Sequence, residues 1–190
     1  MLANFLNSKK LNQEFNLYFS YRYSKLYYEG LKKRINSKIH MFPLNFIDLS
    51  NPDLLGSSIP FIIRRLLMIF VRLVINMPLL IYEILKLNRL LKQIKPNIVH
   101  INSGGFPPSL STKAMIISSK LMGVRKIILV INNSPASYYD LRRIINLPMD
   151  IIINVCVNHF ITGSNYNAIK MRELLSISEK KVISIPNGIK

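Results

Sequence analysis

The sequence predicts an α/β fold in which a mainly parallel sheet is covered by helices on both faces. Short apolar runs, typical of strands buried on both faces, alternate along the 190 residues with longer segments of helical periodicity. Small polar residues directly follow several of these runs. Hydrophobic residues make up 49% of the chain, which is enough to build a core and excludes a disordered protein.

The apolar runs predict strands, and the central one is Ile-Val-His-Ile at residues 98–101. It is bounded by Pro96 on one side and by Gly104 and Gly105 on the other. We expect the two glycines to let the backbone turn with positive φ and to let a ligand approach it closely. In chain order, the predicted strands are residues 15–19, 38–42, 98–101, 126–131, 159–162 and 181–185.

Helices are predicted where apolar residues recur every three or four positions. Ser24 and Ser164 are good N-caps, Pro107 and Pro108 favour a helix start, and Gly123 suits the position just after a helix end. Residues 47–60 contain two prolines and a glycine and are predicted as a loop. The predicted helices cover residues 2–10, 24–35, 80–94, 107–122, 138–146, 148–155 and 165–175.

Residues 61–75 form the most apolar stretch, and Arg64, Arg65 and Arg72 fall in a wedge of about 100° on a helical projection. Two interpretations remain open. The stretch is a core helix whose arginines reach water, or a basic helix lying on a membrane surface with these arginines at the lipid headgroups. A membrane-spanning helix is disfavoured, because each charge at the bilayer centre costs about 2.5–3.5 kcal/mol.

The charge balance is strongly basic, with 26 Lys and Arg against 9 Asp and Glu and a net charge of +17. This predicts attraction to an anionic partner: nucleic acid, an anionic membrane surface or phosphorylated substrates. No nucleic-acid recognition motif is present, so specific nucleic-acid binding is not expected. A single cysteine and three separated histidines give no metal-ligand spacing, and the polar N-terminal residues do not resemble a signal peptide. We therefore expect no metal site and a cytoplasmic protein.

Four predicted strands are followed by small polar residues: Ser20, then residues 102–105, 132–134 and 163–164. Because the carboxyl ends of parallel strands meet at one edge of a sheet, we expect all four segments to line one crevice. Hydroxyls, amides and backbone N–H groups suit sugars and phosphates, whereas no G-x-S-x-G elbow or phosphate-loop lysine is present. The candidate binding residues are Asn102, Ser103, Gly104, Gly105, Asn132, Asn133, Ser134 and Ser164.

Four segments together carry a resemblance to a known family: K-P-N-I-V-H-I-N-S-G-G-F, R-K-I-I-L-V-I-N-N, H-F-I-T-G-S and K-V-I-S-I-P-N-G-I. In this order and spacing they resemble the N-terminal, acceptor-binding domain of a family 4 glycosyltransferase of GT-B fold. The resemblance implies a Rossmann-like domain that binds a saccharide or lipid-linked acceptor, as in cell-envelope or polysaccharide biosynthesis. It further implies a second domain that binds a nucleotide-sugar donor, with the donor as a substrate and no cofactor or metal required.

Residue by residue, the resemblance assigns Asn102 to the place where many relatives carry the second His of a V-H-x-H motif. His100 stands at the first His and is expected to be structural, because it lies within the strand. The amides and hydroxyl of residues 132–134 are expected to line the acceptor crevice, with Ser164 facing it. Asn187 and Gly188 match the hinge between the two domains. No catalytic residue is assigned.

The resemblance also implies which parts of such an enzyme fall outside residues 1–190. We expect a single acceptor-binding domain over these residues, with the first strand of the family and the C-terminal donor domain both missing. The chain would then be a fragment that is inactive alone. Two other classes stay open: a non-catalytic basic module that binds the inner membrane face peripherally, and another Rossmann-like nucleotide-binding protein such as an oxidoreductase. The latter is disfavoured because G-x-G-x-x-G is absent.

Overall fold

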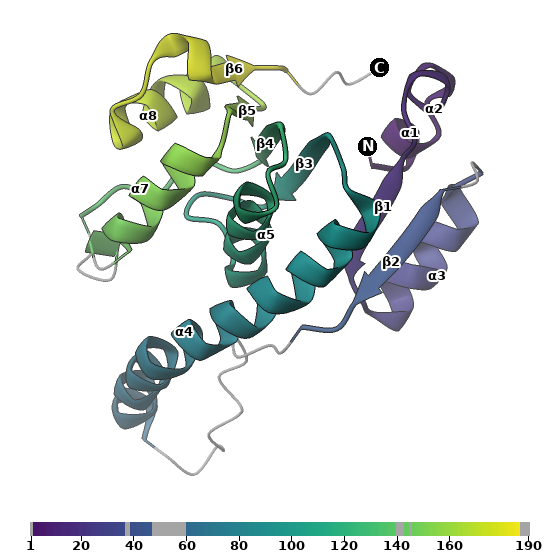
Figure 1. Cartoon of the computed structure of the whole chain (residues 1–190). Coiled ribbons are helices and arrows are strands. Elements are labelled where there is room, and N and C mark those ends of the chain that lie inside the picture. Colours follow the sequence, from purple (N-terminus) through teal and green to yellow (C-terminus); the bar gives the residue numbers. More distant parts are fainter. Residues whose placement is uncertain (1, 37–38, 47–59, 140–142, 145, 187–190) are drawn as a thin grey trace. The chain divides into compact units, whose positions relative to one another are not determined.

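The structure is a computed structural model that describes residues 2–36, 39–46, 60–139, 143–144 and 146–186, without the side chains of residues 2, 61–62 and 64–73. The fold is α/β, with parallel sheets flanked by helices, which confirms the predicted α/β class with a parallel sheet (Figure 1). The chain divides into two compact units, residues 1–54 and 55–190, and each contains one sheet. The predicted hinge residues Asn187 and Gly188 lie outside the described residues.

The first unit is built around a strand–helix–strand motif, with β1 and β2 paired in parallel. Ser24 begins α3 as predicted, because its hydroxyl accepts a hydrogen bond from the backbone N–H of Tyr27 at 3.2 Å. Buried Tyr21, Leu31 and Leu44 come from the two strands and the helix. The elements are α1 (Leu2–Leu6), α2 (Lys9–Glu14), β1 (Tyr18–Arg22), α3 (Lys25–Arg34) and β2 (His40–Leu44).

Strand β1 begins three residues later than predicted, and the cause is an N-cap at Ser8. Its hydroxyl accepts from the N–H of Leu11 and starts a second short helix that continues through Glu14. Ser20 therefore lies inside β1, in the two-stranded sheet, and not after a strand of the larger sheet. The prediction that four polar segments share the edge of one sheet was wrong for Ser20.

The second unit contains a four-stranded parallel sheet in the order β3-β4-β5-β6 (Figure 1). The bounds of β4, β5 and α8 are those predicted from the sequence, and Ser164 is the N-cap of α8. The elements are α4 (Phe61–Ile94), β3 (Ile98–Ser103), α5 (Leu110–Leu121), β4 (Lys126–Ile131), α7 (Leu147–Cys156), β5 (His159–Thr162), α8 (Asn165–Leu175), the short 3-10 helix η2 (Glu179–Lys181) and β6 (Val182–Ser184).

Helix α4 is continuous over 34 residues and contains Pro78, although the sequence predicts separate segments at 61–75 and 80–94. A proline inside a helix leaves the carbonyl four residues earlier without a donor. Pro78 and Val74 are both exposed, so water can hydrate that carbonyl. The candidate membrane-surface residues Arg64, Arg65 and Arg72 belong to this helix, with side chains outside the described ones. Among the described residues, no helix has the length and apolar character needed to cross a membrane.

The core of the second unit lies on one face of its sheet. Ile101, Leu129, Phe160 and Val182 form one row across the four strands and are all buried. The row packs in one apolar cluster with buried side chains of all three connecting helices: Ile116 of α5, Ile153 of α7 and Met171 of α8. This arrangement is expected, because each strand is added on the same side of the previous one and right-handed crossovers then place every connecting helix on one face.

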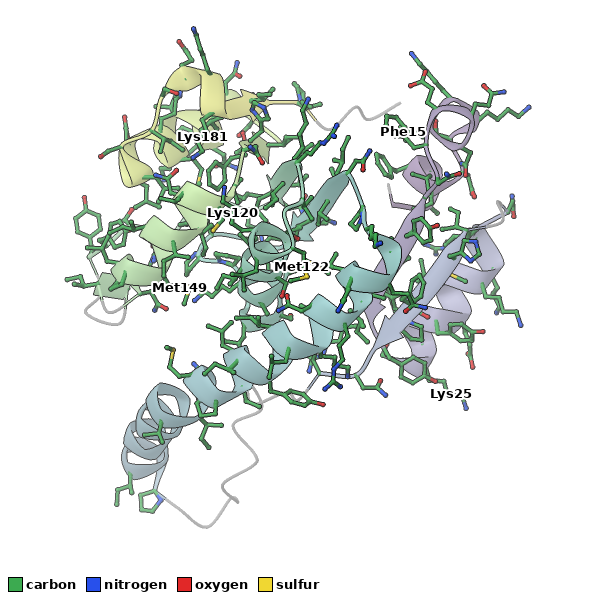
Figure 2. The ribbon with its side chains drawn as sticks, in the orientation of Figure 1. Phe15, Lys25, Lys120, Met122, Met149 and Lys181 are labelled. Carbon is green, nitrogen blue, oxygen red and sulfur yellow. The ribbon has the colours of Figure 1, made fainter. Side chains whose placement is uncertain are left out.

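Two helix ends show how polar groups fix this framework. Gly123 follows α5 with φ of +70°, as predicted for a residue after a helix end, and its N–H donates to the carbonyl of Lys120 at 3.1 Å. Lys181 of η2, labelled in Figure 2, donates from Nζ to Oδ1 of Asn154 in α7 at 2.9 Å. A cation near the last turn of α7 also complements the negative end of the helix dipole.

Candidate functional site

The carboxyl ends of the four strands of the larger sheet are in register. Ser103, Ile131, Thr162 and Ser184 are paired in one row across β3, β4, β5 and β6. The segments that begin at residues 104, 132 and 163 therefore start at the same edge of this sheet. Three of the four segments predicted to share an edge do so.

Strand β3 extends two residues further than predicted, because Asn102 and Ser103 pair with Val130 and Ile131. Consecutive strand residues point to opposite faces of a sheet. Asn102 is exposed, whereas Ser103 is buried and its hydroxyl donates to the carbonyl of Gly105 at 2.8 Å. Ser103 thus shapes the turn that follows β3, and Asn102 contributes to the surface.

Asn102 and Asn132 are joined across neighbouring strands. Nδ2 of Asn132 donates to Oδ1 of Asn102 and to the carbonyl of Ser103, both at 2.8 Å. Beyond them, the N–H of Asn133 donates to the carbonyl of Gly104 at 2.9 Å. The side chains of Asn102, Asn132 and Asn133 are exposed. The edge thus presents a hydrogen-bonded pair of exposed amides in which Nδ2 of Asn102 and Oδ1 of Asn132 are not used in the bonds described above.

Gly104 and Gly105 do not adopt positive φ, so that prediction was wrong: among the described glycines only Gly123 does. The absence of a side chain at these two glycines instead leaves space beside the backbone. A Cβ on Gly104 would meet no atom within 4 Å, and one on Gly105 would lie 3.8 Å from Cβ of Asn133. The backbone of the turn is therefore open to an approaching ligand.

The other two predicted residues differ in their roles. Ser134 is exposed in the segment after β4. Ser164 is half-buried, and its hydroxyl accepts from the N–H of Asn167 at 3.2 Å as the N-cap of α8. Helices α5 and α8 both begin near this edge, and a helix N-terminus carries partial positive charge.

His100 lies within β3, on the same face as Asn102 and two residues before it. Loss of hydration lowers the pKa of its imidazole from the usual 6.5. The ring is therefore neutral at pH 7.

A buried ionic cluster, which sequence reasoning missed, joins the segments after β3 and β4 to helix α7. Arg143 and Asp150 form an ion pair in which the two side chains are 6% and 0% exposed. Nε of Arg143 also donates to the carbonyl of Ala136 at 3.2 Å, and the hydroxyl of Tyr138 donates to Oδ2 of Asp150 at 2.7 Å. The guanidinium lies over the ring of Tyr138 at 4.4 Å and over that of Phe106 at 5.3 Å. The cluster therefore fixes the segments after β3 and β4 to helix α7.

Burial in this cluster shifts two pKa values. Desolvation, together with the hydrogen bond to Asp150, raises the pKa of Tyr138 to about 12. Desolvation and the nearby Arg143 lower the pKa of Lys113, while Asp150 opposes the shift, and Nζ of Lys113 donates to Oδ1 of Asn146 at 3.2 Å. One signal could have located the cluster: Asp150 is one of only nine acidic residues and stands in the apolar segment L-P-M-D-I-I-I.

The opposite edge of the sheet carries a groove between the ends of α4 and α5, lined in part by Lys92, Lys95 and Arg125. Cations are expected there, because helix C-termini carry partial negative charge. Among the described residues, no three His, Cys, Asp or Glu side chains come together as metal ligands.

Comparison of the chain with models of known protein families gives no match, and no curated protein matches it either.

Proposed function

We propose that the chain is the acceptor-binding half of a glycosyltransferase that moves a sugar from a nucleotide-sugar donor to a hydroxyl of a saccharide or lipid-linked acceptor. The observation that carries the proposal is the hydrogen-bonded pair of Asn102 and Asn132 at the carboxyl edge of the parallel sheet. In sheets of this kind, ligands bind beyond the carboxyl ends of the strands.

The chemistry of this edge fits a sugar. A pyranose presents hydroxyls that both donate and accept hydrogen bonds, and the amide pair offers Nδ2 of Asn102 as a donor and Oδ1 of Asn132 as an acceptor. The two amides are bonded to each other, and that of Asn132 is also bonded to the backbone, so little side-chain freedom is lost when a sugar binds. The exposed Asn133 and Ser134 extend this polar surface.

The four sequence segments that resemble family 4 glycosyltransferases add the reaction class to this geometry. The N–H groups after β3 and the start of α5 are suited to a partly negative acceptor oxygen. The donor nucleotide would be bound by the second domain that the resemblance implies, with no cofactor or metal. A nucleotide-binding oxidoreductase is a weaker candidate, because the turn after β3 reads S-G-G-F-P-P and lacks the G-x-G-x-x-G spacing.

The test is a binding experiment on the chain itself. Amide signals in ¹H–¹⁵N NMR spectra are followed while methyl α-glucoside, methyl α-mannoside, methyl β-galactoside or N-acetylglucosamine is added. We expect at least one sugar to shift signals of residues 102–106 and 132–134 selectively, and N102A/N132A to abolish the shifts.

The matched control is Asn97→Ala, which removes an exposed asparagine just before β3, at the other end of the same strand. It should leave sugar binding unchanged. Shifts scattered over both edges of the sheet, or equal losses in the control and the double variant, would contradict the proposal.

A further inference from the structure

Helix α4 has two apolar sides, and the described structure covers one of them. Leu80, Leu87 and Leu91 are buried, and α4 packs against α5, where the hydroxyl of Ser118 donates to the carbonyl of Ile84 at 3.2 Å. On a separate side, Val74, Met77, Ile81 and Leu85 are each between 54 and 57% exposed. We call these four side chains the α4 stripe.

The α4 stripe is continuous along the helix. At 100° per residue its four members fall within about 80° of one another, over a length of about 17 Å. Tyr82, which is 49% exposed, and the exposed Pro78 border it. A helix that is apolar on more than one side is normally enclosed, and a contiguous exposed apolar patch marks an interaction surface.

Basic residues continue the same side of the helix toward its C-terminus. Lys92 projects within the angular range of the stripe and Arg89 about 40° beyond it, and both are exposed. Lys86 projects about 100° beyond the stripe, with Nζ 6.0 Å from the centroid of the Tyr82 ring, and is not part of this side. The one acidic residue of α4, Glu83, is buried on another side. The outward side thus combines aliphatic residues with cations and carries no acid.

This combination favours an anionic lipid surface over a second copy of this chain as the partner of the stripe. Aliphatic side chains partition into the boundary between headgroups and acyl chains, and cations bind the lipid phosphates. Two copies of this chain, each with a net charge of +17, would repel each other when these cations were brought together. The length of α4 allows it to lie in the membrane plane, and no described helix is suited to cross the bilayer.

We propose that the α4 stripe, with Arg89 and Lys92, is a membrane-docking face that seats the protein on anionic lipid. This places docking further along the chain than the arginines at 64, 65 and 72 that the sequence alone singles out. Docking through α4 is independent of the proposed sugar transfer, because the residues of the docking face are not those of the Asn102–Asn132 pair.

Vesicle co-sedimentation tests the proposal with phosphatidylcholine vesicles and with vesicles that also contain phosphatidylglycerol. The intact chain should pellet with the anionic vesicles. The charge variant R89Q/K92Q should reduce partitioning about 30-fold, since each cation near such a surface contributes about fivefold. The stripe variant M77Q/I81Q/L85Q should reduce it by more than about 100-fold.

Matched controls come from the rest of the second unit. I151Q/V155Q removes two aliphatic side chains of α7 that are 57 and 68% exposed, and K120Q/K180Q removes two exposed cations, one near the end of α5 and one in η2. Both controls should pellet as the intact chain does. Equal losses in a control and its matched α4 variant, or an intact chain that stays in the supernatant, would overturn the proposal. A dimer in sedimentation equilibrium that the stripe variant dissolves would instead assign the stripe to a second copy.

A fluorescence measurement tests the same proposal with only one substitution in each variant. The chain contains no tryptophan, so a single introduced one reports its own environment. The emission of L85W should shift to shorter wavelength when anionic vesicles are added, whereas that of V155W should not. No shift for L85W, or an equal shift for both variants, would contradict docking through α4.

Discussion

Tyr138 and Asp150 are joined by a hydrogen bond of 2.7 Å from the phenol hydroxyl to the carboxylate, and the same carboxylate oxygen is paired with Arg143. The three residues connect the segment after β4 to helix α7. Because Arg143 also contacts the ring of Phe106, the segment after β3 is held by the same cluster. The amide pair at the edge of the sheet therefore rests on a buried ionic support, and stability and sugar binding should depend on it together.

Asp150→Asn should lower the free energy of unfolding by about 3–5 kcal/mol, because it leaves the guanidinium of buried Arg143 without a counter-charge. Urea denaturation followed by circular dichroism measures the loss. Glu179→Gln is the control, since Glu179 pairs with Arg172 but its side chain is 83% exposed, and such pairs contribute at most about 1 kcal/mol. Similar losses of unfolding free energy in the two variants would show that the buried pair contributes no more to stability than the exposed pair.

The pKa of Tyr138 predicts a loss of stability in alkali. The phenol stays protonated up to about pH 12 in the folded protein, whereas the unfolded chain releases this proton near pH 10. The unfolded state therefore binds fewer protons between pH 10 and 12, and the stabilising effect of Tyr138, fully present below pH 10, is lost as the pH rises through this window.

Denaturation midpoints of the intact chain and Tyr138→Phe, measured from neutral to alkaline pH, test this sign. The difference between the two should be constant below pH 10 and shrink toward pH 12. Tyr139→Phe, which alters a neighbour that is 98% exposed, should follow the intact chain throughout. A difference that does not change with pH would contradict the raised pKa.

Substitution by alanine should change the stability in opposite directions at Gly104 and at Gly123. Gly104→Ala should raise stability by about 0.4–1 kcal/mol, because its φ is not positive and the added Cβ meets no atom within 4 Å. Gly123→Ala should lower stability by about 1–2 kcal/mol, because φ of +70° strains any residue with a Cβ. Denaturation curves decide both signs. If the turn after β3 touches a sugar, Gly104→Ala should also weaken the NMR response while the protein becomes more stable.

The 190-residue chain should transfer no sugar by itself. The resemblance assigns donor binding to a second domain, and most of the rate enhancement of such a reaction comes from positioning the donor and stabilising the leaving diphosphate. Release of nucleoside diphosphate from UDP-glucose, UDP-galactose or GDP-mannose, with the sugar that binds best in the NMR experiment as acceptor, should not exceed the rate without protein. Turnover above that background would contradict the assignment of this chain to the acceptor half.

The sequence predicts the elements of the second unit well wherever one local signal dominates. The run K-I-I-L-V-I has the length and β-branched content of a buried strand, and Ser164 supplies an N-cap, so β4 and α8 have their predicted bounds. The start of β1 is predicted too early, because the N-cap at Ser8 begins a short helix just before the alternating apolar residues that suggest a strand. β3 is longer than expected because pairing with Val130 and Ile131, a tertiary interaction, keeps two polar residues in the strand.

The candidate site is predicted only in part, for related reasons. Sequence order places the segments at 104, 132 and 163 at one edge, because topology fixes where the ends of parallel strands meet. It does not reveal that Asn102 and Ser103 point to opposite faces, since this depends on where β3 ends. The ion pair of Arg143 and Asp150 depends on how the chain packs between β4 and α7, which no local pattern encodes.

The strands of the larger sheet lie side by side in the order in which they occur in the chain. Paired residues are separated by as few as 22 positions, for Phe160 and Val182, and by 31 for Ile128 and His159. Each new strand therefore finds its neighbour already synthesised, and none has to be inserted between two strands that have already paired. This unit can assemble progressively from β3 to β6 as the ribosome releases it, and shortening it from its C-terminal end would remove border strands while leaving the amide pair between β3 and β4 intact.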